Sequence, residues 1–330
     1  MPGILKRIAT IAAISTAAVV AFASASSAQT VLKLGDIYAQ NHSNSLADKR
    51  FAELVEKKTN GSVKIEVYVD ATLGNEREIA ESVMAGTIDI APSGLSGIGR
   101  FVPQAQVLEL PYLYRDLKHM QRVATAIAPD VDKMFEAKGI RNIGYLFLGP
   151  RSLASRKEVH NVQDMRGLRL RVPESPLYVG FARALGAVPT PVPLPEVYSS
   201  LETGVADAAE GEPATLATTK WYEPTKSVSL TKHIWHYRFI AMNGKKFNSL
   251  SPDQQKAILE AAQEAMEYQG GLVEEFNNKA LDEIKSAGVK IVETKNLDTF
   301  AKTLTEFNTE FAKKLGPEAE ALLQKVRAVQ

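Results

Sequence analysis

Residues 167–176 read GLRLRVPESP, a short strand that runs directly into the start of a helix. Alternate side chains of a strand share a face, so Arg169 and Arg171 point the same way. Arg171 comes last, at the carboxyl end of the strand, where open α/β sheets bind ligands. A guanidinium held there can bind a carboxylate through two parallel hydrogen bonds. The residues alone leave a second interpretation equally open, in which Arg171 is a surface arginine in a solvated ion pair.

Strand-like and helix-like segments alternate on both sides of this stretch. The strand patterns cover residues 31–34, 63–69, 88–91, 140–147, 168–172 and 206–210, and helical patterns cover 44–58, 75–86, 175–185 and 196–203. This rhythm predicts parallel or mostly parallel sheets covered by helices. We therefore expect an α/β protein with two lobes. The second lobe begins near Gly149, and a strand at 234–242 crosses back to the first.

A long helix is predicted after Ser251, which fits the N-cap position with Pro252 in the first turn and Gln254 at the capping-box position. The pattern continues to residue 287 and corresponds to ~54 Å at 1.5 Å per residue, so the helix should span both lobes. Gly270 and Gly271 favour a bend, and two separate helices broken there are the alternative. The expected lobes are 29–148 with 237–276, and 149–236 with 277–330.

The amino terminus has the three parts of a secretory signal peptide. Two basic residues precede an apolar run, and Ser26, Ser27 and Ala28 follow it. We place cleavage after Ala28 and expect a free, soluble periplasmic protein, since the run is shorter than the ~20 residues that span a bilayer. The remaining chain has 37 Lys and Arg against 38 Asp and Glu, a net charge of −1, and no cysteine. These numbers argue against a nucleic-acid partner, disulfides and a lipid-anchoring cysteine.

Motifs of enzymes are poorly represented in this sequence. Residues 94–97 lack the spacing of a nucleophile elbow, and 97–99 lack the third glycine of a dinucleotide site. His233 and His236 are three residues apart, which on a strand places them on opposite faces, so one metal ion could not take both. We expect neither a catalytic metal nor a cofactor.

Several motifs together resemble the DctP-type solute receptors of tripartite ATP-independent periplasmic (TRAP) transporters, and the similarity covers essentially the whole mature chain. The motifs are residues 73–77, 86–89, 110–112, 164–176, 189–191, 196–198 and 205–210. The resemblance implies two α/β lobes that are hinged by crossing strands and a long helix and that close over a small acid. It also implies docking on a membrane permease pair and import driven by an ion gradient.

The resemblance assigns ligand-binding roles to individual residues. Arg171 matches the carboxylate-clamping arginine of the family, and Arg151 matches a second arginine that often reaches the same carboxylate. Gly211 departs from the family pattern, in which many members carry asparagine. The other candidates are Glu174 facing the cleft, Glu76 and Ser93 in the first lobe, Leu194 as a lid, and His236 and Tyr237 on the crossing strand. A surface charge remains the alternative for Arg151, and core packing is the alternative for Tyr237.

The acidic residues among these candidates bear on the ligand. Glu76 and Glu174 would repel a second carboxylate but can accept hydrogen bonds from hydroxyls, which favours a uronate or an aldonate over a plain dicarboxylate. Both could instead neutralise Arg151 or nearby lysines. One alternative function is a periplasmic enzyme on sugar acids that uses these two carboxylates as acid and base. Another is a receptor for an ABC importer or a sensor kinase. We expect a monomer.

Overall fold

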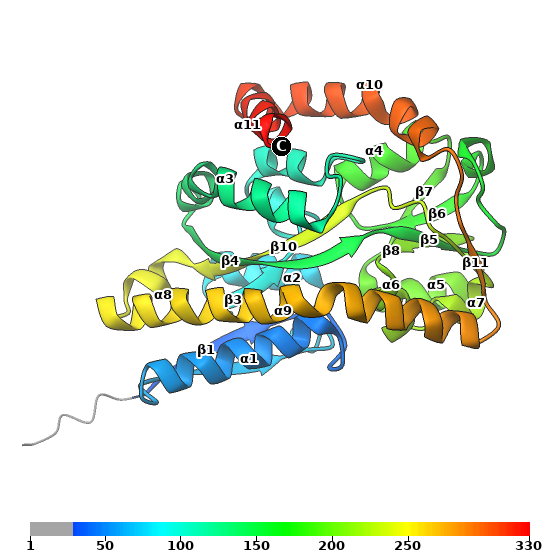
Figure 1. Cartoon of the computed structure of the whole chain (residues 1–330). Coiled ribbons are helices and arrows are strands. Elements are labelled where there is room, and N and C mark those ends of the chain that lie inside the picture. The colour runs from blue at the N-terminus through cyan, green and yellow to red at the C-terminus, as the bar shows by residue number, and fades with distance from the viewer. Residues whose placement is uncertain (1–28) are drawn as a thin grey trace, which may run out of the picture.

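The computed structural model describes residues 29–330, and the predicted signal peptide, residues 1–28, lies outside the described residues. Within the described range the strands form two sheets, and helices cover both of them (Figure 1). We call the first sheet with its helices lobe I and the second sheet with its helices lobe II. The expected two-lobed α/β architecture is therefore confirmed. No helix of this part of the chain is long and apolar enough to cross a bilayer.

The sheet of lobe I is mixed. In spatial order its strands are β2 (Val63–Tyr68), β1 (Thr30–Gly35), β3 (Ile90–Ser93), β10 (Trp235–Asn243) and β4 (Ile140–Pro150). Strand β1 is parallel to β2 and β3, whereas β10 is antiparallel to both β3 and β4. Strand β4 therefore runs in the same direction as β1, β2 and β3, and β10 alone is reversed because it carries the chain back into lobe I, so the sheet is mostly parallel as expected.

The sheet of lobe II is also mixed. In spatial order its strands are β11 (Lys290–Val292), β9 (Ser227–Ser229), β5 (Ser152–Ser155), β8 (Ala208–Gly211), β6 (Arg169–Val172) and β7 (Val188–Pro191). The predicted strand at 168–172 is β6, which runs parallel to β7 and β8. Its carboxyl end carries Arg171, which leads through Pro173 into helix α4.

The helices are placed by local signals as well as by packing. Asn75 caps α2 with a capping box that includes Glu78, and Gly86 ends this helix with a φ of 78°. The α-helices other than the long α9 are α1 (Ser43–Lys58), α2 (Glu76–Ala85), α3 (Leu117–Glu136), α4 (Pro176–Ala184), α5 (Val197–Glu202), α6 (Pro213–Thr218), α7 (Tyr222–Thr225), α8 (Gly244–Asn248), α10 (Leu297–Leu315) and α11 (Pro317–Ala328). Short 3-10 turns are η1 (Ile98–Arg100), η2 (Pro103–Glu109), η3 (Val162–Met165) and η4 (Leu194–Glu196).

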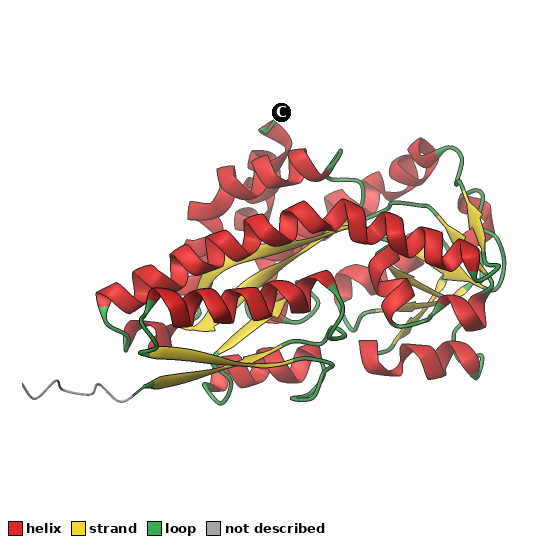
Figure 2. Ribbon diagram, turned by 60° about the horizontal axis from the view of Figure 1, so that its bottom comes forward, coloured by secondary structure: helices red, strands yellow, loops and turns green. Residues whose placement is uncertain are grey.

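Helix α9 (Pro252–Ser286) is 35 residues long and runs along both lobes without interruption (Figures 1 and 2). The expected capping box of Ser251 and Gln254 is present. In lobe I the Gln269 amide oxygen accepts a hydrogen bond from the Phe147 amide at 3.1 Å, and in lobe II Asn277 accepts one from Ala214 at 3.0 Å. The helix is continuous through both glycines, so the alternative of two separate helices is wrong.

Apolar side chains fill the space between the sheets and their helices. One cluster of buried residues joins α3, η2, α4, α10 and α11 across the two lobes, and a second lies between the lobe I sheet, α1 and α9. Helix α11 packs against α3 and η2 of lobe I, whereas α10 also packs against α4 of lobe II. The division of the chain at residues 276 and 277 therefore stays a prediction, and the last helix bridges back to lobe I.

Candidate functional site

The two lobes meet where the chain crosses between them at Arg151 and at Ile234. Arg151 lies between β4 and β5, and its amide donates to the Ile234 carbonyl at 2.8 Å. The Arg151 carbonyl accepts from the His233 amide at 3.1 Å. These paired crossings place the Arg151 side chain at the junction of the lobes.

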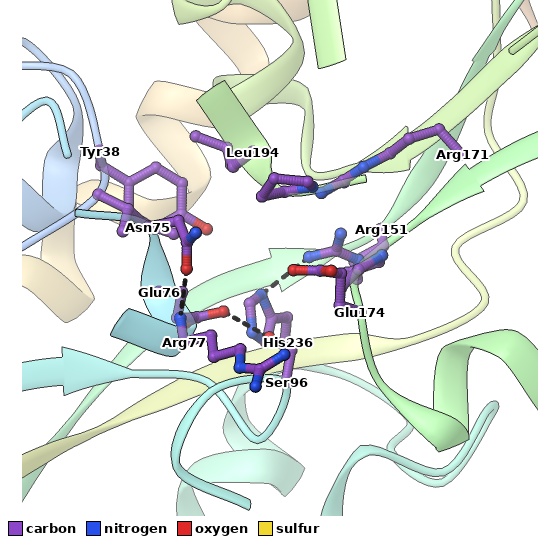
Figure 3. A pocket seen from close by; sticks show the side chains of 13 residues that line it. Tyr38, Asn75, Glu76, Arg77, Ser96, Arg151, Arg171, Glu174, Leu194 and His236 are labelled. Carbon is purple, nitrogen blue, oxygen red and sulfur yellow. Dashed lines mark hydrogen bonds between the residues drawn. The ribbon is translucent and has the colours of Figure 1, made fainter. Parts of the chain in front are cut away.

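A narrow cavity of about 50 Å³ opens beside this junction. Figure 3 shows Tyr38, Asn75 and Glu76 on one side of it and Arg151, Arg171 and Glu174 on the other. Its lining residues are Ile37, Tyr38, Asn75, Glu76, Arg77, Ser96, Arg151, Arg171, Pro173, Glu174, Pro193, Leu194 and His236. The cavity thus lies between lobes, with polar groups from both of them.

Arg171 is held in the cavity wall by its backbone and by two contacts of its side chain. Its Nε donates to the Val192 carbonyl at 2.8 Å, and its guanidinium lies over the Trp221 ring with Cζ 5.4 Å from the ring centroid. The side chain is 2% exposed, and within residues 29–330 no carboxylate lies within 4.0 Å of it. Burial lowers its pKa to about 10, so the group stays charged at neutral pH. Both Nη atoms remain available for a carboxylate.

Arg151 has a different environment, because two buried glutamates surround it. Its Nε and Nη2 bind the two carboxylate oxygens of Glu210, and Nη1 donates to Glu212 at 2.8 Å. Burial opposes the ionisation of Glu210, but Arg151 and His233 outweigh it and lower the pKa of this carboxyl to about 2. Arg151 is therefore a compensated cation, and the alternative of an exposed surface charge is wrong for it, since it is 5% exposed.

His236 lies between two carboxylates. Its Nδ1 is 2.6 Å from Glu212 and its Nε2 is 3.4 Å from Glu109, which comes from lobe I. Burial by itself lowers the pKa of His236, but Glu212 and Glu109 outweigh burial and raise it to about 9. The imidazole is therefore charged at neutral pH, and it lines the cavity.

The lobe I wall presents hydrogen-bonding groups that belong to the start of α2 and the loop after β3. The Asn75 oxygen caps α2, accepting from the amides of Arg77 and Glu78, which leaves its NH₂ group free of that role. Glu76 accepts from the Gly94 amide at 2.8 Å and from the Ser96 hydroxyl. These contacts fix the Glu76 carboxylate at the cavity edge. Glu76 contacts neither Arg151 nor a lysine within 4.0 Å in the described part of the chain, so the neutralising role lies with Glu210 and Glu212.

The other candidates divide into two groups. Glu174, which is exposed, and Leu194 line the cavity. Ser93 does not line it, because its buried hydroxyl donates to the Gly94 carbonyl and accepts from the Ile98 amide. Tyr237 also points elsewhere and packs against the aromatic rings of Tyr114, Tyr145, Phe147 and Phe239.

Gly211 lies behind the cavity instead of in its wall. A Cβ atom there would be 3.2 Å from Cζ3 of Trp221, the ring on which Arg171 lies. A side chain as large as asparagine would press on that ring. The departure from asparagine thus leaves room for the aromatic support of Arg171.

The structure also assigns residues that the sequence interpretation missed. Glu212 and Glu109 were not selected, and Glu210 was noted only as part of a motif. Glu210 and Glu212 are two residues apart at the end of β8, and this spacing predicts one shared face, so a signal was present. The premise that His233 and His236 lie on one strand is wrong. His233 precedes β10, so strand alternation does not apply, and both rings reach the glutamates around Arg151.

Two lobes with a buried guanidinium in the wall of the cavity between them are typical of a solute-binding protein. The chain belongs to the DctP family, bacterial extracellular solute-binding protein family 7, whose family model matches residues 34–314. The expected resemblance is therefore confirmed.

Three similar proteins illustrate this family. The chain is 33% identical over 320 residues to the 2,3-diketo-L-gulonate-binding periplasmic protein YiaO of Escherichia coli K12, covering 96% of this chain and 98% of that one. A TRAP periplasmic solute-binding protein of Roseobacter denitrificans with bound β-D-glucuronate has a TM-score of 0.88 and 29% identity, covering 91% and 100%. A second protein of that organism, with bound L-galactonate, has a TM-score of 0.84 and 28% identity, covering 91% and 99%.

Proposed function

We propose that this chain is a periplasmic receptor that binds a hydroxylated monocarboxylate, a uronate or an aldonate, between its lobes and delivers it to a TRAP permease. The observation that carries the proposal is the guanidinium of Arg171. It is buried, fixed by Val192 and Trp221, and has no carboxylate partner among residues 29–330. A buried cation without a partner is costly, and a ligand carboxylate compensates it.

The opposite wall supports the hydroxylated part of the ligand. Asn75, Ser96 and Glu76 contribute amide, hydroxyl and carboxylate groups to the cavity, and Glu174 adds a second carboxylate. The carboxylates accept hydrogen bonds from ligand hydroxyls and the Asn75 NH₂ group donates to them, whereas a second ligand carboxylate would meet like charges. The related proteins named above bind 2,3-diketo-L-gulonate, β-D-glucuronate and L-galactonate, which agrees with this class of ligand.

The size of the cavity supports a hinged mechanism. A volume of about 50 Å³ admits a few water molecules, since one water needs about 10–15 Å³ by a similar measure. A six-carbon acid therefore enters only if the lobes move apart, and closure then completes the site around it.

The ligand class is tested by mass spectrometry of acids that co-purify with the protein, followed by a thermal-shift panel. D-glucuronate and D-galactonate should raise the melting temperature, because a ligand that binds only the folded state stabilises it by mass action. D-glucose, which lacks the carboxylate, and succinate, which lacks the hydroxyls, are the matched controls. Stabilisation by succinate alone, or by D-glucose as strongly as by the acids, would contradict the proposal.

The other parts of the proposal have their own tests. An enzyme acting on these acids would convert them during incubation, whereas a receptor returns them unchanged, as NMR of the recovered acid shows. Uptake into vesicles that contain a TRAP permease, driven by an ion gradient without ATP, tests delivery. The mass of the exported protein tests cleavage after Ala28, and sedimentation tests the expected monomer.

A further inference from the structure

A continuous set of buried charges runs from lobe II to lobe I behind the cavity. It consists of Glu210, Arg151, Glu212, His236 and Glu109, each at most 5% exposed. Glu212 is its centre, because this carboxylate accepts from Arg151 at 2.8 Å, from His236 at 2.6 Å and from the Thr215 hydroxyl at 3.0 Å.

These contacts consume the hydrogen-bonding capacity of Arg151. A guanidinium has five N–H donors. The Nε hydrogen and one on Nη2 go to the Glu210 carboxylate, the other Nη2 hydrogen goes to the Glu210 carbonyl, and one on Nη1 goes to Glu212. One N–H on Nη1 remains, and Nη1 lies 3.0 Å from Nδ1 of His236, so Arg151 cannot clamp a carboxylate with two parallel bonds. Its positive charge is also balanced by two carboxylates that are shared with His236 and His233.

Arg171 differs on both counts. One of its five donors is used, by the Val192 carbonyl, and its charge has no carboxylate within 4.0 Å among residues 29–330. Three arginines line the cavity, and the third, Arg77, is exposed and binds Glu81 through its Nε at 3.0 Å. Of the two buried ones, Arg151 and Arg171, only Arg171 offers a free pair of Nη groups and, among residues 29–330, a charge with no carboxylate within 4.0 Å. A ligand with one carboxylate matches this arrangement. A second carboxylate on the same ligand would lie towards Glu76 and Glu174, where Arg77 is exposed and already paired with Glu81.

We propose that Glu212 is a specificity-determining residue: by binding Arg151 and His236 together, it restricts the cavity to monoanions and excludes the dianion of the same carbon chain. This inference rests on the proposed function, since it presumes a sugar-acid receptor. It goes further by naming the residue that sets the charge of the accepted ligand. Placing a ligand carboxylate next to protein carboxylates costs free energy, so this repulsion discriminates strongly between ligands of different charge.

The test compares D-galactonate with galactarate, which has the same carbon chain but a carboxylate at both ends. Calorimetry of the wild type should give a dissociation constant for galactarate that is at least about a hundredfold higher than that for D-galactonate. In Glu212→Gln, which keeps the shape but loses the charge, the ratio of the two constants should fall at least about tenfold. A ratio within about threefold of the wild-type value in the folded variant would overturn the inference.

Two further variants separate charge from packing. Thr215→Val removes a hydrogen bond to Glu212 without changing charge. The ratio of its dissociation constants for galactarate and D-galactonate should equal that of the wild type. A shift as large as that of Glu212→Gln would mean that packing, not charge, sets the ratio, and would overturn the inference. His236→Gln removes a cation and should raise the dissociation constant for galactarate relative to that for D-galactonate. If Glu212→Gln does not fold, the measurement on His236→Gln is the test. A ratio of the galactarate to the D-galactonate dissociation constant that falls or stays unchanged in this variant contradicts the inference.

The outcome for the wild type distinguishes this inference from the proposed function. Equal binding of the two acids would overturn the role of Glu212 and leave the sugar-acid receptor in place. Binding of neither these acids nor D-glucuronate would overturn both.

Discussion

The guanidinium of Arg171 lies over the indole ring of Trp221, with 5.4 Å between Cζ and the ring centroid. Trp221 is 1% exposed, and the absence of a side chain at Gly211 leaves room for its ring. The ring therefore supports the cation from the side away from the ligand. An arginine held in this way loses little conformational freedom when it binds a carboxylate.

Replacing Trp221 should weaken ligand binding although Arg171 itself is unchanged. We expect Trp221→Leu to raise the dissociation constant for D-galactonate about tenfold, because a desolvated cation–π contact contributes ~1–2 kcal/mol. Trp221→Phe keeps a ring face and should recover most of the affinity. Calorimetry measures the affinities, and melting curves verify that the variants fold. Equal affinities for leucine and phenylalanine variants would show that the ring face has no role.

Glu174 lies at the exposed edge of the cavity in lobe II. If its carboxylate accepts hydrogen bonds from ligand hydroxyls, Glu174→Gln should weaken D-galactonate by ~1–3 kcal/mol, the scale for unpairing a polar group. Hexanoate, which has no hydroxyls, should be affected far less. The exposed Glu202→Gln variant is the control and should match the wild type. Equal losses for the two acids would contradict the hydroxyl role.

The raised pKa of His236 makes stability depend on pH in a defined direction. Its pKa is about 9 in the folded protein, against an ordinary value of 6.5, because of Glu212 and Glu109. The stabilisation is fully present below pH 6.5 and is lost as the pH rises through 9. In urea unfolding, the difference between wild type and His236→Gln should shrink by about 3 kcal/mol from pH 6 to pH 10.

The control for this experiment is His160, which is half exposed on the surface. The variant His160→Gln should follow the wild type across the same pH range. A constant gap between the wild type and His236→Gln would mean that the histidine is neutral in the folded protein, and the charge assignment would be wrong.

The surroundings of two helical glycines predict opposite effects of an alanine substitution on stability. A Cβ at Gly271 meets nothing within 4 Å, so Gly271→Ala should stabilise the protein by ~0.5–1 kcal/mol through helix propensity. A Cβ at Gly180 in α4 would lie 2.5 Å from the Phe307 ring, so Gly180→Ala should destabilise it by ~1–3 kcal/mol. Urea unfolding of both variants measures the signs. A destabilising effect at Gly271 would indicate that the helix needs flexibility there.

Local sequence signals predicted the features that depend on neighbouring residues. The capping box at Ser251 predicted α9, and strand alternation with a following proline placed Arg171 at the end of β6. These features need no knowledge of distant contacts, so the sequence was sufficient. Family resemblance added Arg151, Glu174, Glu76 and Leu194, which all line the cavity.

The remaining features depend on contacts between distant segments. Adjacent side chains of β10 point to opposite faces, so His236 and Tyr237 cannot both face the cavity. The packing of distant segments decides that His236 lines the site while Tyr237 enters the aromatic core. The pairing of Arg151 with Glu212 joins residues 61 positions apart and follows from the fold. The spacing of Glu210 and Glu212 was the one local hint of this pairing.

We expect Arg171 to bind the carboxylate of the ligand. Calorimetry measures this with wild type, Arg171→Lys and Arg171→Ala, using D-galactonate or whichever acid binds best in the thermal-shift panel. Removing the guanidinium leaves a ligand carboxylate without its partner, which should cost ~2–5 kcal/mol, and lysine should restore only part because it lacks the two-pronged geometry. The variants should stay folded, since in the described part of the chain no carboxylate would lose its partner when Arg171 is replaced. Binding of Arg171→Ala within about threefold of the wild type, less than ~0.7 kcal/mol, would contradict the account.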